Sequence, residues 1–483
     1  MGLTITSILG IAGALIAVYL AQFNRVLRRT PAAARRHLPA KPLTREDIAK
    51  TFERVSRDGI DYASRRPQRR ARRYIVVGGS GVLGGEIVVQ LLEGGTPREA
   101  IRIIDVRPST RDELKADGRE TTLGFVQADI TSSASVDAAF STPWPAAVSA
   151  LPLTVFHSAA VIRPAERSPL LYDRCARVNV AGTANVVAAA RRAGAGVLIA
   201  TSSSTVATRP VPWFRWWRHG GPPGFVQVLT EEDFDRPLRE AHADYPTNYM
   251  RSKAEAERLV CDADEARPGP GAASGRPAMR TAAIRPGNIV YGGRNDIVLG
   301  KILADGVAYT FSAPWVQHWT SDGNAALAHI QCEAALLGEH TSRVAGRPYL
   351  VRDKGPPLRF EDMYSVLSTT SITGFVVRYP LPVVLLLVAY AVEAYVVLVN
   401  RFPWLQRFLA EPRGPVSMLQ PGTFTSTVSL VLDDSLSKKA PVDGGIGYEP
   451  ACTSVEGICA QVVEWNKWAI KTGLVNKKQD KTR

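Results

Sequence analysis

Short apolar runs alternate with helical patterns along the middle of the chain. Each run is followed by glycine or polar residues, as expected of strands that are buried on both faces. The runs lie at residues 74–77, 101–104, 124–128, 154–156, 197–200 and 282–284. This regular alternation predicts an α/β fold with a doubly wound parallel sheet, in which ligands bind at the carboxyl ends of the strands.

The first run leads into a glycine-rich segment, GGSGVLGG at residues 78–85, and then into an apolar helix pattern at residues 86–92. In Rossmann-like folds, a strand, a glycine turn and a helix in this order hold a pyrophosphate on the N-terminus of the helix. We therefore expect a dinucleotide to bind at Gly78, Gly81, Val82, Leu83 and Gly84.

An acidic residue, Asp105, closes the second predicted strand. It lies about twenty residues beyond the glycine segment, where a carboxylate binds the ribose hydroxyls and repels a 2′-phosphate. NAD is therefore favoured over NADP. Arg107 lies close by and supports the alternative, because an arginine at this place can accept the phosphate.

Residues that follow the other predicted strands complete the expected cofactor site. They share one edge of the sheet because the strands are parallel. We expect cofactor contacts from Asp129, Ile130, Ser158, Ala159 and Pro286.

A tyrosine and a lysine lie four residues apart in the segment YMRSK, residues 249–253. On a helix this spacing puts both side chains on one face. The Lys253 ammonium favours the phenolate form of Tyr249, so we expect a lowered pKa and a phenol that acts as acid or base near neutral pH. Beside a dinucleotide, the pair predicts hydride transfer at a carbinol or carbonyl carbon, with both residues also contacting the cofactor.

Seven segments, in order, resemble the extended short-chain dehydrogenases/reductases. They are VVGGSGVLGG at residue 76, ADI at 128, VFHSAA at 155, VNVAGT at 178, ATSSSTV at 200, YMRSK at 249 and RPGNIVYG at 285. This resemblance implies that Ser203, Tyr249 and Lys253 form the catalytic triad and that Asn179 holds a proton-relay water. Ser203 is the third residue of the Thr-Ser-Ser group, and its neighbours Ser202 and Ser204 stay open as alternatives.

The C-terminal half resembles one branch of that class, the 3β-hydroxysteroid dehydrogenases, including the decarboxylating sterol-4α-carboxylate 3-dehydrogenases. The likeness rests on an apolar segment at residues 375–399 that is followed by LSKKAP at 436, GYEP at 447 and EGICAQVVEW at 456. It implies NAD-dependent oxidation of a 3β-hydroxyl on a sterol, steroid or triterpenoid. It also implies an endoplasmic reticulum enzyme that meets membrane lipid, an apolar sterol-like substrate and other membrane-bound enzymes of the sterol pathway.

The sequence leaves several activities open. Oxidation of a sterol with a neighbouring carboxylate gives a β-keto acid that can lose carbon dioxide, and plain oxidation would use the same residues. A nucleotide-sugar epimerase or dehydratase shares the fold and the triad, but the apolar segments argue against it. A non-catalytic NAD-binding scaffold is the other alternative, and the retained Tyr249–Lys253 pair argues against it.

The positive charge of the chain is concentrated near its N-terminus. The net charge is +14, and residues 24–73 contain sixteen Lys/Arg and five Asp/Glu. A nucleic-acid-binding protein would carry its basic residues on the folded body, so we expect no nucleic-acid partner. We expect residues 24–73 to be a basic juxtamembrane linker. It would contain an amphipathic helix at residues 44–56, and arginines at 65–73 that are solvated or hold anionic headgroups.

Two segments are predicted to meet a membrane. Residues 3–23 carry no charge, and as a helix they would be roughly 31 Å long, enough to span a bilayer core. The arginines that follow put the enzyme on the cytosolic side. Residues 375–400 contain Glu393, which would be costly at bilayer depth, so we expect a dipping or interfacial hairpin, with a buried core helix as the alternative.

Two insertions interrupt the pattern. Residues 268–277 are rich in proline, glycine and alanine and are predicted to be a disordered loop. Residues 209–225 interleave basic and aromatic side chains, and we expect them to form a membrane-contacting rim of the substrate mouth; a folded surface loop is the alternative. The aromatic and basic cluster is Trp213, Phe214, Arg215, Trp216, Trp217 and Arg218.

The five cysteines are scattered without paired spacing, so we expect neither disulfides nor a metal site. The predicted order of parts is a transmembrane anchor (1–23), the basic linker (24–73), an NAD-binding domain (74–284) and a smaller substrate-binding region (285–374). A membrane-associated segment (375–400) and the C-terminal part of the substrate region (401–483) follow.

Overall fold

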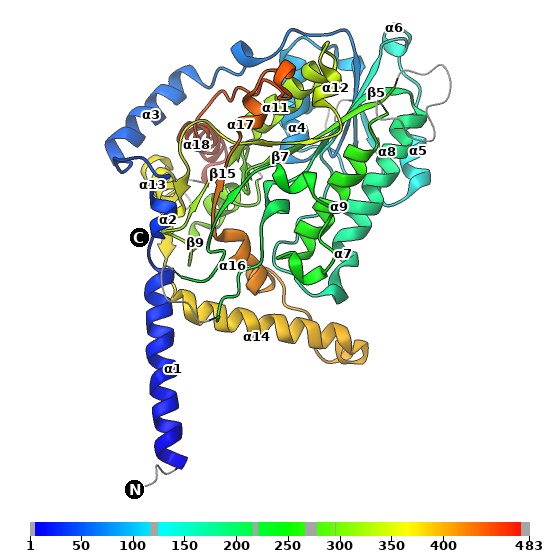
Figure 1. Cartoon of the computed structure of the whole chain (residues 1–483). Helices are drawn as coiled ribbons and strands as arrows, with labels where there is room; N and C mark the ends of the chain where they lie inside the picture. The colour runs from blue at the N-terminus through cyan, green and yellow to red at the C-terminus, as the bar shows by residue number, and fades with distance from the viewer. Residues whose placement is uncertain (1–4, 116–123, 216–220, 266–277, 295, 475–483) are drawn as a thin grey trace.

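The computed structural model describes residues 5–115, 124–215, 221–265, 278–294 and 296–474, and a seven-stranded parallel sheet lies at its centre (Figure 1). Its strands are β1 (Arg73–Val77), β2 (Ile101–Asp105), β3 (Phe125–Gln127), β4 (Leu153–His157), β5 (Ala195–Thr201), β7 (Arg280–Pro286) and β12 (Pro348–Val351). Their order is β12-β7-β5-β4-β1-β2-β3. The predicted doubly wound sheet is confirmed.

Helices cover both faces of this sheet because its strands are apolar on both sides. One face packs against α4 (Val82–Glu93) and α11 (Asp322–Leu336), and the other against α5 (Ser133–Ser141), α8 (Thr183–Arg192) and α9 (Asn248–Asp262). The strand order reverses between β1 and β4, so the ligand crevice opens at their carboxyl ends.

A smaller region sits beside the central sheet and is assembled from distant parts of the chain. Its main sheet has the order β13-β10-β15-β6, and two short pairs, β11-β8 and β14-β9, accompany it. These strands are β6 (Val226–Leu229), β8 (Val290–Tyr291), β9 (Val307–Tyr309), β10 (Val316–Gln317), β11 (Thr320–Ser321), β13 (Leu358–Arg359), β14 (Val376–Arg378) and β15 (Ser429–Leu432). Because β15 pairs with β6, residues beyond the second apolar segment belong to the folded body.

Further helices complete the body. They are α6 (Ala146–Ser149), α7 (Asp173–Ala176), the π-helix η5 (Arg177–Gly182), α10 (Leu299–Asp305), α12 (Thr341–Val344), α13 (Phe360–Thr370), α15 (Pro415–Met418), α16 (Pro421–Thr427), α17 (Ser435–Lys438) and α18 (Ser454–Lys471). Several 3-10 turns connect these elements. The predicted loop at residues 268–277 lies outside the described residues.

The N-terminal segment contains α1 (Ile5–Leu27), α2 (Ala32–Arg35) and α3 (Arg45–Asp58). Its part beyond the apolar run at residues 3–23 is packed against the body instead of forming a solvated linker. The predicted amphipathic helix is confirmed as α3: Thr44 caps it, and Ile48 and Val55 are buried. Helix α3 lies against α13 and α18, and Arg54 pairs with Glu456. The linker prediction missed this packing because it depends on partners some 400 residues away in the sequence.

The arginine run at residues 65–73 is also bound to the body. Arg65 pairs with Glu449, and Arg66 with Glu93. The buried Arg72 donates to Thr154 Oγ1 at 2.7 Å. The prediction of solvated or headgroup-binding side chains is wrong for these three arginines, because protein acceptors already bind their guanidinium groups.

The second apolar segment forms a single continuous helix, α14 (Pro382–Arg401), and the predicted hairpin is wrong. Pro382 occupies the first turn, where a proline does not disturb a helix. Glu393 lies within the helix, and its carboxylate pairs with Arg167. Helix α14 lies across the base of the body, while α1 projects away from the body (Figure 1). By length and composition alone, α14 and the helical segment that begins with α1 are each able to cross a membrane.

The predicted aromatic rim is partly wrong. Trp213 is buried in the core of the smaller region, where its ring stacks on Trp315 and its Nε1 donates to Thr425 Oγ1 at 3.3 Å. Phe214 is 38% exposed and lies between Phe23 and Tyr390, and Arg215 is exposed as well. Trp216, Trp217 and Arg218 lie outside the described residues. Charge and aromaticity did not reveal that Trp213 faces inward.

Candidate active site at the carboxyl edge of the sheet

The glycine segment has the shape that a dinucleotide requires. Gly78 follows β1 with φ +82°, and a Cβ there would lie 2.5 Å from Ala159 N. A Cβ on Gly84 would lie 2.2 Å from Gly78 O. Helix α4 then begins at Val82, so its first backbone N–H groups face the crevice between β1 and β4. Only glycine fits at these two positions, and the loop fits a pyrophosphate.

Asp105 lies at the end of β2 and points toward the glycine segment. Its Oδ2 accepts a hydrogen bond from Ser80 N at 3.2 Å, and its Oδ1 accepts one from Val106 N at 2.7 Å. This places a carboxylate where ribose hydroxyls bind. Arg107, two residues further on, is exposed. The geometry supports NAD as the cofactor.

The remaining predicted cofactor residues also lie at strand ends. Ser158 follows β4 and its Oγ donates to Val77 O at 3.1 Å, which brings Ser158 and Ala159 beside the glycine loop. Asp129 follows β3 and accepts a hydrogen bond from Thr131 N at 2.9 Å. Its neighbour Ile130 is buried, and Pro286 ends β7.

The predicted triad comes from β5 and α9. Ser203 follows the end of β5, and its Oγ lies 2.8 Å from Thr205 Oγ1. Tyr249 and Lys253 lie one turn apart near the start of α9, which Thr247 caps. The Ser203 side chain is close enough to the Tyr249 phenol to influence its pKa, and the Lys253 ammonium donates to Thr201 O. The structure thus brings the three residues together at one strand end.

The alternatives to Ser203 are placed differently. Ser202 and Ser204 are both buried, and neither hydroxyl has a hydrogen-bond partner among the residues described. Of the three serines, Ser203 is the one whose hydroxyl opposes the rise in the pKa of Tyr249. This effect on the phenol therefore favours Ser203.

Burial changes the acid–base properties of the triad. It raises the pKa of Tyr249 to about 12, although the hydrogen bond from Ser203 acts in the opposite direction. Burial also lowers the pKa of Lys253 to about 8, against the attraction of Glu257. The sequence predicts a lowered tyrosine pKa, and this is wrong for the structure, because loss of solvation outweighs any stabilisation of the phenolate.

Asn179 lies in the π-helix η5, a distortion that is frequent at functional sites. Its side chain accepts from Val161 N at 2.8 Å and donates to Val161 O at 3.0 Å and to Ser252 Oγ at 2.9 Å. The amide therefore joins the loop after β4 to the catalytic helix. Its predicted role in holding a water stays a prediction.

His157 is a residue that the sequence argument missed. It ends β4, is buried, and its Nε2 lies 2.9 Å from Thr183 Oγ1. Burial, together with the nearby Lys253 charge, lowers the pKa of His157 to about 3, so the ring is neutral at physiological pH. Its position in the segment VFHSAA, at the end of a predicted strand, was the sequence signal that could have marked it as a site residue. A neutral histidine there limits the positive charge around Lys253.

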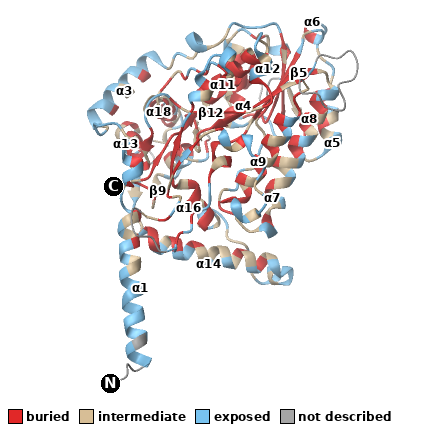
Figure 2. Ribbon diagram, in the orientation of Figure 1, coloured by how far each residue is buried: buried red, intermediate tan, exposed pale blue. Residues whose placement is uncertain are grey.

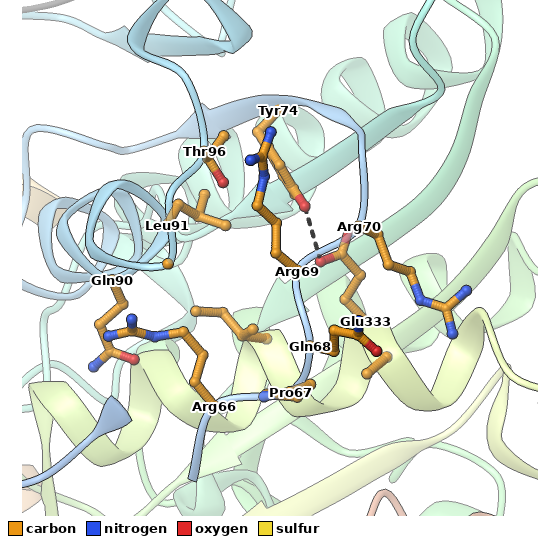
Figure 3. A pocket seen from close by; sticks show the side chains of 13 residues that line it. Arg66, Pro67, Gln68, Arg69, Arg70, Tyr74, Gln90, Leu91, Thr96 and Glu333 are labelled. Carbon is orange, nitrogen blue, oxygen red and sulfur yellow. Dashed lines mark hydrogen bonds between the residues drawn. The ribbon is translucent and has the colours of Figure 1, made fainter. Parts of the chain in front are cut away.

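Two cavities lie elsewhere. One of about 40 Å³ is lined by Arg66, Arg69 and Arg70 and by Tyr74, which bonds to Glu333 at 3.4 Å (Figure 3). A larger one lies beside Trp144 near the start of β4. Both are at the amino edge of the sheet, and none of the described residues that line them belongs to the triad or the glycine segment.

The structure also shows where the cysteines and other potential metal ligands lie. The five cysteines are buried free thiols. Within the described ranges, no group of three His, Cys, Asp or Glu side chains is arranged to hold a metal ion.

Parts of the chain are similar to known protein families. Residues 75–212 match the 3-beta hydroxysteroid dehydrogenase/isomerase family, and residues 153–325 match the Male sterility protein family. The 3 beta-hydroxysteroid dehydrogenase type 7 of Mus musculus is 29% identical over 295 residues, which cover 60% of this chain and 70% of that protein. The decarboxylating sterol-4-alpha-carboxylate 3-dehydrogenase of Candida albicans is 24% identical over 320 residues, covering 65% and 79%.

Solved structures give the same fold. A UDP-glucose-4-epimerase from Stenotrophomonas maltophila aligns with a TM-score of 0.52 at 16% identity, over 83% of this chain and 99% of that chain. At this identity the likeness concerns the fold alone.

Fold, site geometry and sequence matches agree on the type of enzyme: the chain is an NAD-dependent oxidoreductase that acts on CH–OH groups. Part of it is similar to the 3-beta hydroxysteroid dehydrogenase/isomerase family, and it resembles the decarboxylating sterol-4-carboxylate dehydrogenases at modest identity.

Proposed function

We propose that the chain oxidises the 3β-hydroxyl of a sterol, steroid or triterpenoid to the 3-ketone with NAD. The arrangement that carries the proposal is the cluster of Ser203, Tyr249 and Lys253 at the carboxyl edge, next to the glycine segment. Relatives that are named for this oxidation support the substrate class.

NAD, when bound, supplies the acceptor for the hydride of the carbinol carbon. The protein itself binds the substrate and moves the proton. Ser203 and Tyr249 would hold the substrate hydroxyl, and the phenolate oxygen of Tyr249 would take its proton as the carbonyl forms. Lys253 lies on the same face of α9 as Tyr249, and its ammonium donates to Thr201 O. It would bind the ribose hydroxyls and favour the phenolate form of Tyr249.

On a substrate with a carboxylate at the neighbouring carbon, the same oxidation makes a β-keto acid. The bond to the carboxylate carbon then breaks, its electron pair moves toward the new ketone as an enolate, and carbon dioxide leaves. A proton returned to carbon completes the reaction. This step needs no further oxidant, because the hydride transfer is the only redox change.

The two apolar helices support a membrane-borne substrate. We infer that α1 anchors the chain in the endoplasmic reticulum membrane, with the catalytic body in the cytosol and next to other enzymes of the sterol pathway. Arginines at positions 25, 28 and 29 follow the apolar part of α1 and favour this orientation. In microsomes, a glycosylation acceptor placed before residue 3 should be modified, and one placed after residue 483 should not. The reverse result would overturn the orientation.

A loss-of-function experiment tests the substrate class. Lipid extracts of cells that lack the protein should accumulate 3β-hydroxysterols or their 4-carboxylates, and a wild-type copy should remove them. A copy with Tyr249→Phe should not. Accumulation of nucleotide sugars instead would favour the epimerase alternative.

A further inference from the structure

Helix α14 presents two different faces. Val383, Leu386 and Val399 are buried toward the body, whereas Leu387 and Val388 on the same helix are exposed. Figure 2 shows this helix along the base of the body, beside the point from which α1 projects. A helix that is apolar on its outer face as well as on its inner face needs an apolar partner outside the protein.

The contact between α14 and α1 indicates what that partner is. Val383 N donates to Asn24 Oδ1 at 3.5 Å, and Asn24 directly follows the uncharged residues 3–23. The start of α14 therefore lies at the level where the uncharged run ends. If that run crosses the hydrocarbon core, α14 lies at the headgroup boundary, where half-buried helices bind. A lipid surface is the partner that fits.

The inner face of α14 is tied to the active site by an ion pair. Arg167, in the loop that follows β4, donates to the Glu393 oxygens at 2.8 and 2.5 Å. Such two-pronged arginine–carboxylate bonds fix geometry as well as charge. The side chains of Arg167 and Glu393 are 30% and 16% exposed, so water and salt screen this pair less than a surface pair.

The same loop is bonded to the catalytic helix. Glu166 O accepts from Asn248 N at 2.8 Å, and Asn248 is adjacent to Tyr249. Val161 is held at both backbone groups by Asn179. The loop therefore bridges α14 and the start of α9.

We propose that Arg167 and Glu393 are positioning residues that link the lipid-facing helix α14 to the loop at residues 158–168, so that lipid contact fixes the loop against the catalytic helix. The inference rests on the proposed membrane-borne substrate, and it adds a route by which the membrane acts on the site. The residues named here do not touch the reacting atoms.

Hydrogen exchange of the full-length chain in phosphatidylcholine nanodiscs tests the link without any substrate. Arg167→Ala should raise exchange in residues 158–168 about tenfold, within the usual range of coupling between sites. Leu387→Glu leaves the ion pair intact but weakens lipid contact, and it should raise exchange in the same loop. Arg192→Ala is the matched control: it breaks the pair with Asp137, whose side chains are 57% and 43% exposed, and should change nothing in the loop.

Activity and rescue complete the test. Arg167→Ala should raise the KM for a sterol presented in vesicles about tenfold while NAD binding, the control for folding, stays unchanged. The swapped pair, Arg167→Glu with Glu393→Arg, should restore most of the loss. Unchanged loop exchange in Arg167→Ala, or in Leu387→Glu, would overturn the proposal. If sterols are not substrates, wild-type turnover is absent while the exchange differences remain, so the two failures are distinguishable.

Discussion

The cofactor side of the molecule is built from local backbone, whereas the proposed membrane side, next to α1 and α14, is built from side chains that meet across long stretches of sequence. At the cofactor side, Gly78 and Gly84 pack directly against backbone atoms. At the membrane side, Trp315 Nε1 donates to Leu27 O at 2.8 Å, and Arg167 binds Glu393. A short sequence motif is enough to determine the shape of a site made of local backbone. The shape of a surface made of side chains that are distant in sequence is determined only by the complete fold.

The largest effect should come from removing the phenol that transfers the proton. Tyr249→Phe should lower kcat about 10⁴-fold, at the upper end of what acid–base catalysis contributes. NAD binding should stay within a few-fold, because the glycine segment is untouched. Tyr172→Phe is the control, since it removes a half-buried phenol that donates to Glu255 Oε2 at 2.6 Å. Wild-type rates in Tyr249→Phe on the true substrate would contradict the assignment.

The two ends of α1 should contribute differently to stability. Its last turns should stabilise the folded body, whereas its first turns should serve only as a membrane anchor. Phe23 is fully buried, whereas Leu15 is 66% exposed. Phe23→Ala should reduce the free energy of unfolding by about 3 kcal/mol, and Leu15→Ala by less than about 0.5 kcal/mol. Denaturation of both variants in the same detergent measures the difference. Equal stabilities would mean that α1 is an independent tether.

The pH dependence should follow the raised pKa of Tyr249. Oxidation needs the phenolate, whose fraction grows roughly tenfold per pH unit below a pKa of about 12, so kcat/KM for the alcohol should rise from about pH 6 to pH 8. Reduction of the ketone needs the phenol and should not rise. Above about pH 8, Lys253 loses its proton and the KM for NAD should increase. A flat profile for oxidation would contradict proton transfer by Tyr249.

The smallest effect should concern cofactor choice. Asp105 lies at the ribose position, so NAD should be preferred over NADP about tenfold, equivalent to about 1.4 kcal/mol. Asp105→Ser should erode this preference, and the ratio of kcat/KM values measures it. Equal use of both cofactors by the wild-type enzyme would show that Arg107 controls the site instead.

The same contrast explains which parts could be predicted from the sequence. The sheet, the glycine segment and the Tyr249–Lys253 pair were predictable because each follows from a local pattern, whereas Ser203 came from the family resemblance. The burial of Trp213 and the packing of α3 on α18 were not, since both depend on partners far away in the sequence. Glu393 was expected to be costly at bilayer depth, but nothing in its sequence neighbourhood pointed to Arg167 as its partner.

The most direct measurement of the central claim uses the purified full-length chain with NAD and a vesicle-borne sterol that carries a 3β-hydroxyl and a 4α-carboxylate. NADH should form together with the 3-ketone, and a parallel sample with Tyr249→Phe should produce neither. Carbon dioxide released in equal amount would establish the decarboxylating reaction, and its absence would leave plain oxidation. If no NADH forms with any 3β-hydroxysterol while UDP-glucose is epimerised, the account is contradicted.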